Sequence, residues 1–404
     1  MVKNFQLYSE FNKINGLPFF KTGDLTVLLS QAVKEIGDGL IEVVVSEKNF
    51  KQIGSFVVEE IKKQNPTVNA LLVDGEHFTA SSFKSLIDKN AKAVIVIGGC
   101  DLLSYIRYYS SLLKIDCYAI PTTPLLENLI NPKVILKTKN LPATVDAVQF
   151  KCVLIDEAVI LKGDRSEFAE AYLSTMGKLT SLIDYKINSF LTNEKINAEL
   201  FNLVKQAINK SASLSLYENH KSVIIYSQLL LALVNNKSTI LNGSGFEVVD
   251  TALSLFAPNL SGGERKWIAF QKTAKIYHMY FSNDFSELLS VANYEEDLEL
   301  LEQVTNKNRA YFSKNLKIPS ERRRNLINIL MHKTSKDFKS ETSLILSLLF
   351  GIKKTYQKLE SAFVKKQTAS YKQIKNAITV SPYLSQKIGV LTLCRDMGIL
   401  KCAN

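Results

Sequence analysis

Residues 91–123 read AKAVIVIGGCDLLSYIRYYSSLLKIDCYAIPTT. An apolar run ends in Gly98 and Gly99, and an amphipathic stretch then leads to a second apolar run. A buried strand that is followed by a glycine turn, a helix and another strand is typical of a parallel βαβ unit. Such a turn can hold a phosphate group against the first N–H groups of the helix. The stretch therefore predicts an α/β fold with a ligand site at the two glycines.

The same alternation extends to both sides of this unit. Strands are predicted at 41–46, 68–75, 93–99 and 117–123, and helices at 50–64, 81–90 and 102–113. Further strands are predicted at 134–141, as one arm of a hairpin, and at 152–160. Because single helices separate the strands, we expect a Rossmann-like, doubly wound parallel sheet with ligands at the carboxyl ends of its strands.

The pattern changes near Arg165, where apolar residues begin to recur at spacings of three and four and prolines become scarce. This periodicity predicts helices, in the segments 166–189, 194–210, 218–235, 246–257, 263–281, 284–305, 319–333, 341–363 and 371–400. We therefore predict two domains, an α/β nucleotide-binding-like domain over residues 1–164 and an all-α domain over residues 165–404. The site is expected in the cleft between them.

Composition and charge limit the class of protein. The 404 residues carry a formal net charge of +11, but the basic residues are spread along the chain, with RRR at 322–324 as the only tight cluster. This favours a basic surface over a specific nucleic-acid site. No segment approaches the roughly 18 consecutive apolar residues of a membrane span. The five cysteines form no CxxC pair and the N-terminus lacks a secretory signal, so we expect a cytoplasmic protein with reduced thiols.

Six motifs follow an order known from one enzyme superfamily. They are GEHFTASSFKSLI (75–87), VIVIGGCDLLSYIRYYSSLLKIDCYAIPTTP (94–124), MGKLTSLIDYKINSFLTNEK (176–195), LNGSGFE (241–247), GGERKWIAF (262–270) and LSQKIGVLTLCRDMGIL (384–400). In these the chain resembles the superfamily of 3-dehydroquinate synthase, glycerol-1-phosphate dehydrogenase and iron-containing alcohol dehydrogenases, and it looks most like the bacterial glycerol-1-phosphate dehydrogenase branch. The resemblance implies a dehydroquinate synthase-like fold, a dinucleotide across the glycine turn, and a divalent ion held by one carboxylate and two histidines.

The positions that the resemblance assigns to the metal ligands hold other residues in this chain. The carboxylate position is Ser174, and the two histidine positions are Val248 and Gly262. Valine and glycine side chains have no lone pairs to offer a cation. The histidines of the chain, interpreted as surface or capping residues, are His77, His220, His278 and His332. We therefore expect neither zinc nor iron.

The cofactor motif is altered as well. In the family's Gly-Gly-Gly-x-x-x-Asp turn, the third glycine and the aspartate correspond to Cys100 and Ser104, and Arg107 stands where a lysine usually follows. Candidate contacts for NAD(P), as a vestigial site, are Gly98, Gly99, Ser104, Arg107, Thr122 and Thr123, and candidate substrate-pocket residues are Glu127 and Lys178. An ordinary strand-ending turn is an equally good interpretation of Pro121 and Thr122. No catalytic residue is assigned.

These observations lead to two main hypotheses. In the first, the chain is a pseudoenzyme that keeps the fold and acts as a binding, regulatory or assembly component, through self-association or a protein partner, with NAD(P) as a possible ligand. In the second, it is an active NAD(P)-dependent oxidoreductase with an atypical or absent metal site, in which Lys178 near Asp184 polarises an oxygen. A third alternative, suggested by the charge alone, is binding to nucleic acid or a phospholipid surface.

Overall fold

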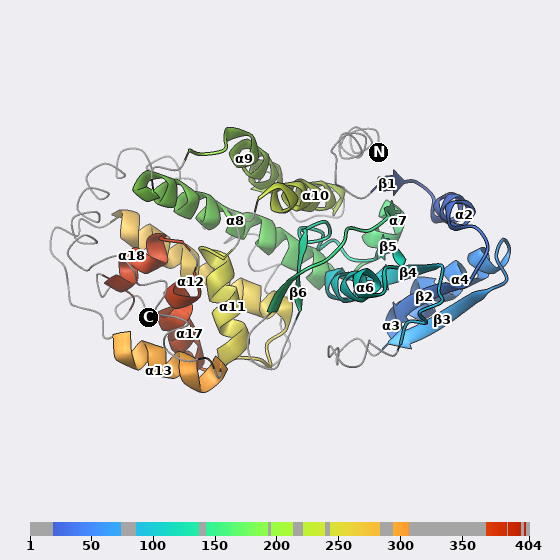
Figure 1. Cartoon of the computed structure of the whole chain (residues 1–404). Helices are drawn as coiled ribbons and strands as arrows, with labels where there is room; N and C mark the ends of the chain where they lie inside the picture. The colour runs from blue at the N-terminus through green and yellow to red at the C-terminus, as the bar shows by residue number, and fades with distance from the viewer. Residues whose placement is uncertain are drawn as a thin grey trace. The chain divides into compact units, whose positions relative to one another are not determined.

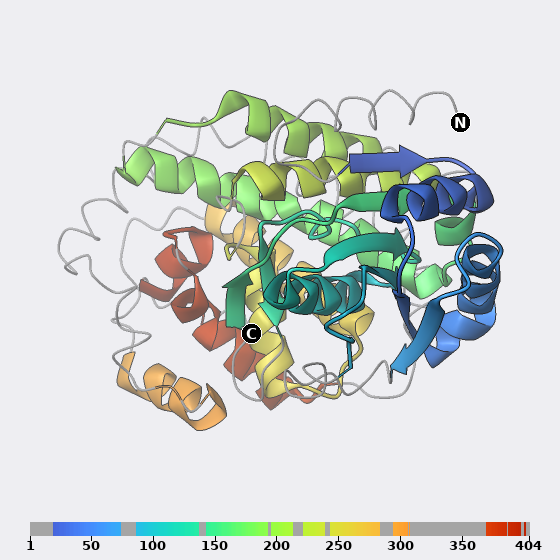
Figure 2. The same cartoon turned by 45° about the vertical axis from the view of Figure 1, so that its right-hand side comes forward.

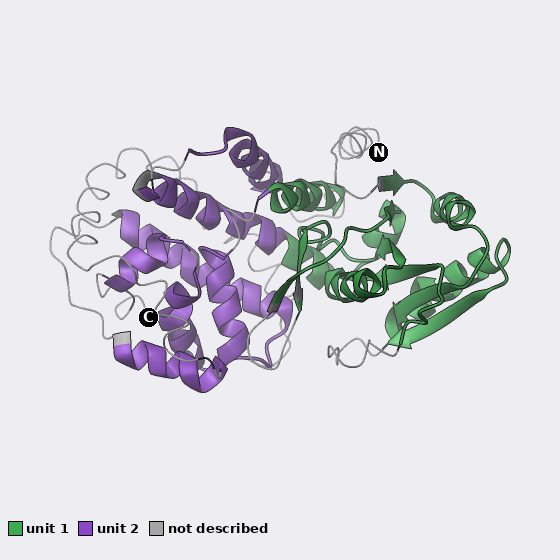
Figure 3. Ribbon diagram, in the orientation of Figure 1, with its two compact units in different colours: residues 1–171, 218–237 green, residues 172–217, 238–404 purple. Residues whose placement is uncertain are grey.

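The computed structural model describes residues 19–73, 86–136, 143–192, 195–212, 221–238, 243–282, 294–305, 307, 369–385, 387–396 and 400. The chain forms two compact units, the first from residues 1–171 and 218–237 and the second from residues 172–217 and 238–404 (Figure 3). The Gly-Glu motif at 75–76, most of the predicted helix at 81–90, and the predicted helices at 319–333 and 341–363 lie outside the described residues. In the part of the chain that is described, no helix has the length and apolar character needed to cross a membrane.

The first unit is built on a six-stranded parallel sheet (Figure 1). In chain order its strands are β1 (Phe19–Thr22), β2 (Ile41–Ser46), β3 (Val68–Val73), β4 (Ala93–Gly98), β5 (Asp116–Pro121) and β8 (Cys152–Ile155). Their order in the sheet is β1-β8-β5-β4-β2-β3, and every pair is parallel. The chain runs outward from β2 to β3 and then returns to place β4 on the other side of β2. The carboxyl ends of β2 and β4 therefore lie at the switch point where ligands bind in such sheets.

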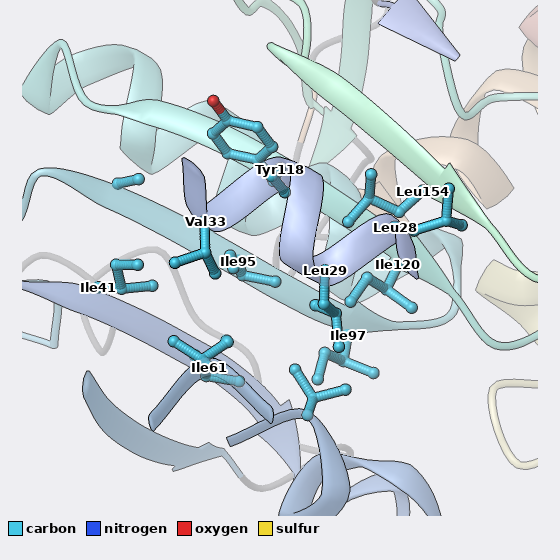
Figure 4. Close-up of a cluster of buried hydrophobic side chains, with 14 of the residues drawn as sticks. Leu28, Leu29, Val33, Ile41, Ile61, Ile95, Ile97, Tyr118, Ile120 and Leu154 are labelled. Atoms are coloured by element: carbon cyan, nitrogen blue, oxygen red, sulfur yellow. The ribbon is translucent and has the colours of Figure 1, made fainter. Parts of the chain in front are cut away.

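The helices of this unit are α2 (Leu25–Ile36), α3 (Glu47–Asn49), the π-helical turn η1 (Phe50–Gly54), α4 (Ser55–Lys62), α6 (Cys100–Leu113) and α7 (Glu157–Leu161). Close packing explains the apolar runs of the sequence. Val94, Ile95, Val96 and Ile97 of β4 are all fully buried, as is typical of a strand that is covered on both faces. On one side, the apolar face of α2 belongs to the same cluster of side chains as β4 and β5 (Figure 4).

The structure confirms the predicted parallel sheet and corrects one strand. The strand predicted at 152–160 ends at Ile155, because Asp156 begins α7 by accepting a hydrogen bond from the N–H of Ala158 at 2.8 Å. The other carboxylate oxygen of Asp156 accepts from the N–H of Leu25 at 3.1 Å, at the start of α2. The predicted hairpin arm is β6 (Lys133–Leu136), which pairs antiparallel with β7 (Ala143–Asp146) and packs against α6 (Figure 1, Figure 2).

The described part of the second unit is helical, as predicted. Besides the larger part of α8 (Arg165–Thr192), it contains α9 (Ala198–Ala212), α11 (Phe246–Phe256), α12 (Gly262–Ser282), α13 (Tyr294–Thr305), α17 (Tyr371–Leu384) and α18 (Val390–Asp396). Helix α11 packs against α12 and α17, and α17 also packs against α13 and α18. These contacts bury apolar side chains of α11, α12 and α17, which is how a helical domain obtains its stability.

The division of the chain differs from the predicted boundary at residue 164. Helix α10 (Lys221–Lys237) belongs to the first unit, although the segments around it in the sequence belong to the second (Figure 3). Its Gln228 is fully buried, and its Oε1 accepts hydrogen bonds from the N–H groups of Leu126 and Glu127, each at 3.1 Å. The side chain of Asn235 donates to the carbonyl of Glu127 at 2.9 Å. These buried amide contacts attach α10 to the segment that follows β5.

Candidate functional site

The glycine turn and the end of the next strand come together in the first unit. Gly98 ends β4 beside Pro121 of β5, and the N–H of Thr122 donates to the carbonyl of Gly98 at 3.0 Å. Gly99 caps α6 with an extended backbone. A Cβ atom at Gly99 would lie 3.3 Å from the Cγ2 atom of Thr123. The structure thus places four of the predicted cofactor contacts side by side, at the carboxyl ends of two central strands.

This turn offers hydrogen-bond donors to an anion. Helix α6 starts directly after Gly99, and no side chain caps its first N–H groups. Four such N–H groups lack intrahelical partners at any helix start, and the helix dipole makes this end positive. The Oγ1 atom of Thr122 is buried and has no hydrogen-bond partner among the described residues. A buried hydroxyl without a partner costs free energy, and a ligand at the turn can supply that partner.

Negative charge opposes an anion at the same place. Asp101 lies in the first turn of α6. Burial and the charges of Asp101 and Glu127 together raise the pKa of the Cys100 thiol to about 12, so both carboxylates act on this thiol. The thiol is therefore neutral at physiological pH. Backbone hydrogen bonds would stabilise a phosphate at the turn, whereas repulsion by the two nearby carboxylates would offset part of this stabilisation.

Arg107 does not serve the turn as predicted, because its guanidinium group is used inside the unit. The side chain is 1% exposed. Its Nη1 atom donates to the carbonyl of Leu129 at 3.2 Å and to Gln149 at 3.0 Å, and its Nη2 atom donates to the carbonyl of Asn131 at 2.5 Å. Burial lowers its pKa to about 10, which leaves it charged at neutral pH. Arg107 thus fixes the segment that follows β5, which the sequence pattern did not indicate.

Two further predicted residues lie in the same unit. Ser104 is half-buried on α6, one helical turn after Cys100. Glu127 is also half-buried, and its backbone is held on both sides by α10, through Gln228 and Asn235. The position of Glu127 therefore depends on the same buried amides that attach α10.

In the second unit, Lys178 is paired within the protein. Its side chain is 2% exposed, and its ammonium group forms an ion pair with Glu247 of α11. The other oxygen of Glu247 accepts a hydrogen bond from the N–H of Gly243 at 2.8 Å. A charged group inside a protein needs such a partner, because an unpaired charge there is costly. Lys178 therefore joins α8 to the loop that leads into α11.

The glycines of the two surrounding motifs are required by packing. A Cβ atom at Gly177 would lie 2.5 Å from the ring of Phe246, and one at Gly245 would lie 2.5 Å from the hydroxyl of Thr180. Gly245 also has a φ of +55°, which side-chain-bearing residues rarely adopt. The same hydroxyl of Thr180 accepts from the N–H of Phe246 at 2.9 Å. The motifs at 176–195 and 241–247 thus form one close contact between α8 and α11.

The positions that the resemblance assigns to a metal are filled by the helical packing. Ser174 on α8 and Val248 on α11 are each 2% exposed, and Gly262 is the first residue of α12. Valine and glycine side chains supply no donor atom, so this set does not fit a divalent ion. Among the described residues, no group of three or more His, Cys, Asp and Glu side chains is placed to hold one.

Two acidic residues close to these positions in sequence are engaged by cations. Asp250 of α11 accepts from Arg265 of α12 at 2.6 Å and lies 3.9 Å from the ammonium group of Lys266. Glu247 is paired with Lys178. Of the histidines, only His278, half-buried on α12, lies within the described residues. The charge of the carboxylates is therefore balanced inside the protein.

Comparisons with known proteins agree with the architecture. No family model matches the chain. A glycerol-1-phosphate dehydrogenase [NAD(P)+] of Metallosphaera sedula is 29% identical over 160 residues, which are 39% of this chain and 43% of that protein. The match therefore spans less than half of the curated relative.

Solved structures match over almost the whole chain. A probable glycerol dehydrogenase of Sinorhizobium meliloti has a TM-score of 0.59 at 10% identity and covers 95% of this chain and 96% of its own. A mutant of an archaeal alcohol dehydrogenase from a Red Sea brine pool has a TM-score of 0.59 at 11% identity. This match covers 96% of the present chain and 98% of the alcohol dehydrogenase. At such identities the likeness concerns the fold. The parallel sheet and the helical unit of this chain thus share the two-domain fold of these two dehydrogenase structures.

Proposed function

We propose that this protein keeps the dehydrogenase fold without metal-dependent catalysis, and acts as a binding, regulatory or assembly component through self-association or a protein partner. The observation that carries the proposal is the filling of the assigned ligand positions by Ser174, Val248 and Gly262, two of which are buried in helical packing. A catalytic divalent ion in such a site needs donor atoms at about 2.0–2.2 Å.

The survival of the other motifs supports the same conclusion. Gly177, Thr180, Gly245 and Phe246 contact one another closely, and such contacts tolerate little change in volume. A chain that had lost metal chemistry would still need these residues in order to fold. Resemblance at these motifs therefore supports the fold and is no argument for retained catalysis.

The test is a metal titration of the purified full chain. We expect elemental analysis after incubation with zinc, nickel or iron(II) salts, followed by desalting, to find far less than one ion per chain. The matched variant carries Ser174→Asp, Val248→His and Gly262→His, and a gain of one tightly held ion there would support the assignment of the positions. One ion per chain in the unmodified protein would overturn the proposal.

A second candidate function is an active NAD(P)-dependent oxidoreductase, favoured by the start of α6, which no side chain of the described residues caps, next to Thr122. Its sequence support is the similarity to the Metallosphaera sedula enzyme. Here the nicotinamide cofactor would accept the hydride, and Gly98, Gly99, Thr122 and Thr123 would bind its phosphates. This candidate is tested by following reduction of NAD+ and NADP+ with glycerol 1-phosphate as substrate.

Ligand binding at the turn is measured separately by thermal shift with NAD+, NADP+ and ADP, because a ligand stabilises the state to which it binds. The control is Gly99→Asp, which adds a third carboxylate at the start of α6. A shift that this variant abolishes, together with turnover, would favour the second candidate. A shift without turnover would support a binding protein.

A further inference from the structure

Asp184 is a buried carboxylate of α8 that holds the start of α18. It is 2% exposed. Its Oδ1 atom accepts hydrogen bonds from the N–H of Val390 at 2.9 Å and from the hydroxyl of Tyr277 at 2.7 Å. The backbone of Gly245 forms a third hydrogen bond to this carboxylate. One side chain thus joins α8, α12, the loop before α11 and the N-terminus of α18.

The segment that leads into α18 follows α8 closely. Asn188, one turn after Asp184, accepts from the N–H of Ile388 at 3.4 Å. A Cβ atom at Gly389 would lie 2.2 to 2.4 Å from atoms of the Asp184 carboxyl group, so only glycine allows this approach. Before it, the hydroxyl of Ser385 donates to the carbonyl of Gly243 at 3.0 Å. Polar groups therefore attach this segment, and Asp184 makes its closest contact.

The environment of Asp184 favours its neutral form. Burial raises its pKa to about 6, although the three hydrogen bonds and the positive charge of Lys387 act in the opposite direction. The titratable groups that act on it from neighbouring elements are Tyr277 of α12 and Cys394 of α18. Burial raises the pKa of both above their ordinary values, so neither changes its charge between pH 5 and 8. Asp184 is thus the group in this cluster that titrates in that range.

We propose that Asp184 is a proton-controlled latch for the C-terminal segment 385–396, which binds α8 more tightly when the carboxyl group is protonated than when it is ionised. The carboxyl group keeps an acceptor oxygen for Val390 in either form. Ionisation inside the closed cluster, however, costs desolvation that is relieved when the segment opens and water reaches the carboxylate.

The direction of the pH dependence follows from the linkage between proton binding and opening of the segment. The pKa of Asp184 is about 6 when the segment is closed, against an ordinary value of 3.8 when water surrounds it. A raised pKa means that the closed form gains stability as the pH falls through 6 and loses it as the pH rises. With these two values, the equilibrium constant for opening increases about tenfold between pH 5 and 8.

The experiment is amide hydrogen exchange of the full chain, read by mass spectrometry on peptides that cover residues 387–396. Rates are corrected for the intrinsic effect of pH and compared with peptides of β4 in the same digest. We expect the protection of the C-terminal peptides to fall about tenfold from pH 5 to 8, whereas that of β4 stays constant. Equal protection of the C-terminal peptides at both pH values would overturn the proposal.

Three variants distinguish the effect of ionising Asp184 from the effect of losing a hydrogen bond to the C-terminal segment. Asp184→Asn keeps the shape and an acceptor oxygen but cannot ionise, and we expect its protection to be independent of pH. Asn188→Ala is the matched control, since it removes the contact with Ile388 and should lower protection at every pH while keeping the slope. Tyr277→Phe removes a donor to the ionised form, so the transition should move to higher pH. A pH dependence that persists in Asp184→Asn would show that another group is responsible.

Discussion

The two units carry glycine motifs of similar appearance that have different uses. In the second unit, Gly177, Gly245 and Gly389 each face another side chain so closely that a Cβ atom would lie within 2.5 Å of it. In the first unit, a Cβ atom at Gly99 would lie 3.3 Å from Thr123, and the helix start beside it has no side-chain cap. Packing explains why the second unit needs its glycines. Packing does not explain Gly99 of the first unit, where a ligand could make contact. A motif shared with an enzyme family is therefore informative about function only after its packing role is known.

The largest effect in this comparison is expected for Gly389→Ala. The added methyl group would overlap the buried carboxyl group of Asp184, and relief requires a shift of either helix α8 or the backbone before α18. Overpacking of this kind costs about 3 kcal/mol of unfolding free energy. The measurement is urea denaturation, with Gly99→Ala as a control for the glycine-to-alanine change itself, since the φ of Gly99 is −81° and a Cβ atom there would lie 3.3 Å from Thr123. Equal losses in both variants would contradict the packing argument.

The next effect is that of Arg107→Met. The substitution leaves the carbonyls of Leu129 and Asn131 without their buried donor, and we expect a loss of about 2 kcal/mol in unfolding free energy. Any thermal shift caused by nucleotides should persist, because the guanidinium group faces these carbonyls. Arg107→Lys provides the control for charge. If Arg107→Met lost nucleotide binding but kept its unfolding free energy, Arg107 would contact the nucleotide at the glycine turn, contrary to our expectation.

A smaller effect is expected for Lys178→Met. The substitution removes the ammonium group that pairs with Glu247, whose side chain is 24% exposed and keeps the hydrogen bond from Gly243. We expect a loss of about 1 kcal/mol, since the remaining carboxylate is partly hydrated. Glu247→Gln should cost more, because the buried ammonium group then loses the negative charge that faces it. The comparison is made by thermal denaturation, and the reverse order would mean that Lys178 is solvated.

The smallest effect on stability is expected for Thr122→Val. None of the described residues forms a hydrogen bond with this hydroxyl, so its replacement by a methyl group of similar size should change the unfolding free energy by less than about 1 kcal/mol. If the turn binds a phosphate, the same variant should weaken the thermal shift with ADP several-fold. If the thermal shift with ADP is the same in Thr122→Val and in the unmodified protein, the carboxyl ends of β4 and β5 do not bind the nucleotide through this hydroxyl. The glycine turn would then be structural, like the glycines of the second unit.

Much of the fold follows from periodicity. Fully buried strands such as β4 are continuous apolar runs, and the long helices repeat at three and four residues. Neither strand β1 nor helix α2 is among the predicted elements. Strand β1 is only four residues long, too short for a pattern to show, whereas α2 has 12 residues and its apolar spacing was overlooked. The end of β8 was predicted too late in the sequence, because Asp156 caps helix α7 within a largely apolar stretch.

The candidate site was less accessible from the sequence. Glycines at the end of a strand have few structural roles, so the position of Gly98 and Gly99 could be predicted. Arg107 could not, because a charged residue on an amphipathic helix is usually exposed, and only the fold brings the carbonyls of Leu129 and Asn131 to its side chain. Asp184 had the same disadvantage, since its partners Tyr277 and Val390 are 93 and 206 residues away in sequence.

The membership of α10 in the first unit affects how the chain is made. The ribosome synthesises the strands of the sheet first, but Gln228 and Asn235, which fix the segment after β5, come more than a hundred residues later. Two helical segments that belong largely or wholly to the second unit, α8 and α9, emerge in between. The first unit therefore stays incomplete until residue 237 has left the exit tunnel, and a fragment that is cut at residue 171 would lack part of its own interior.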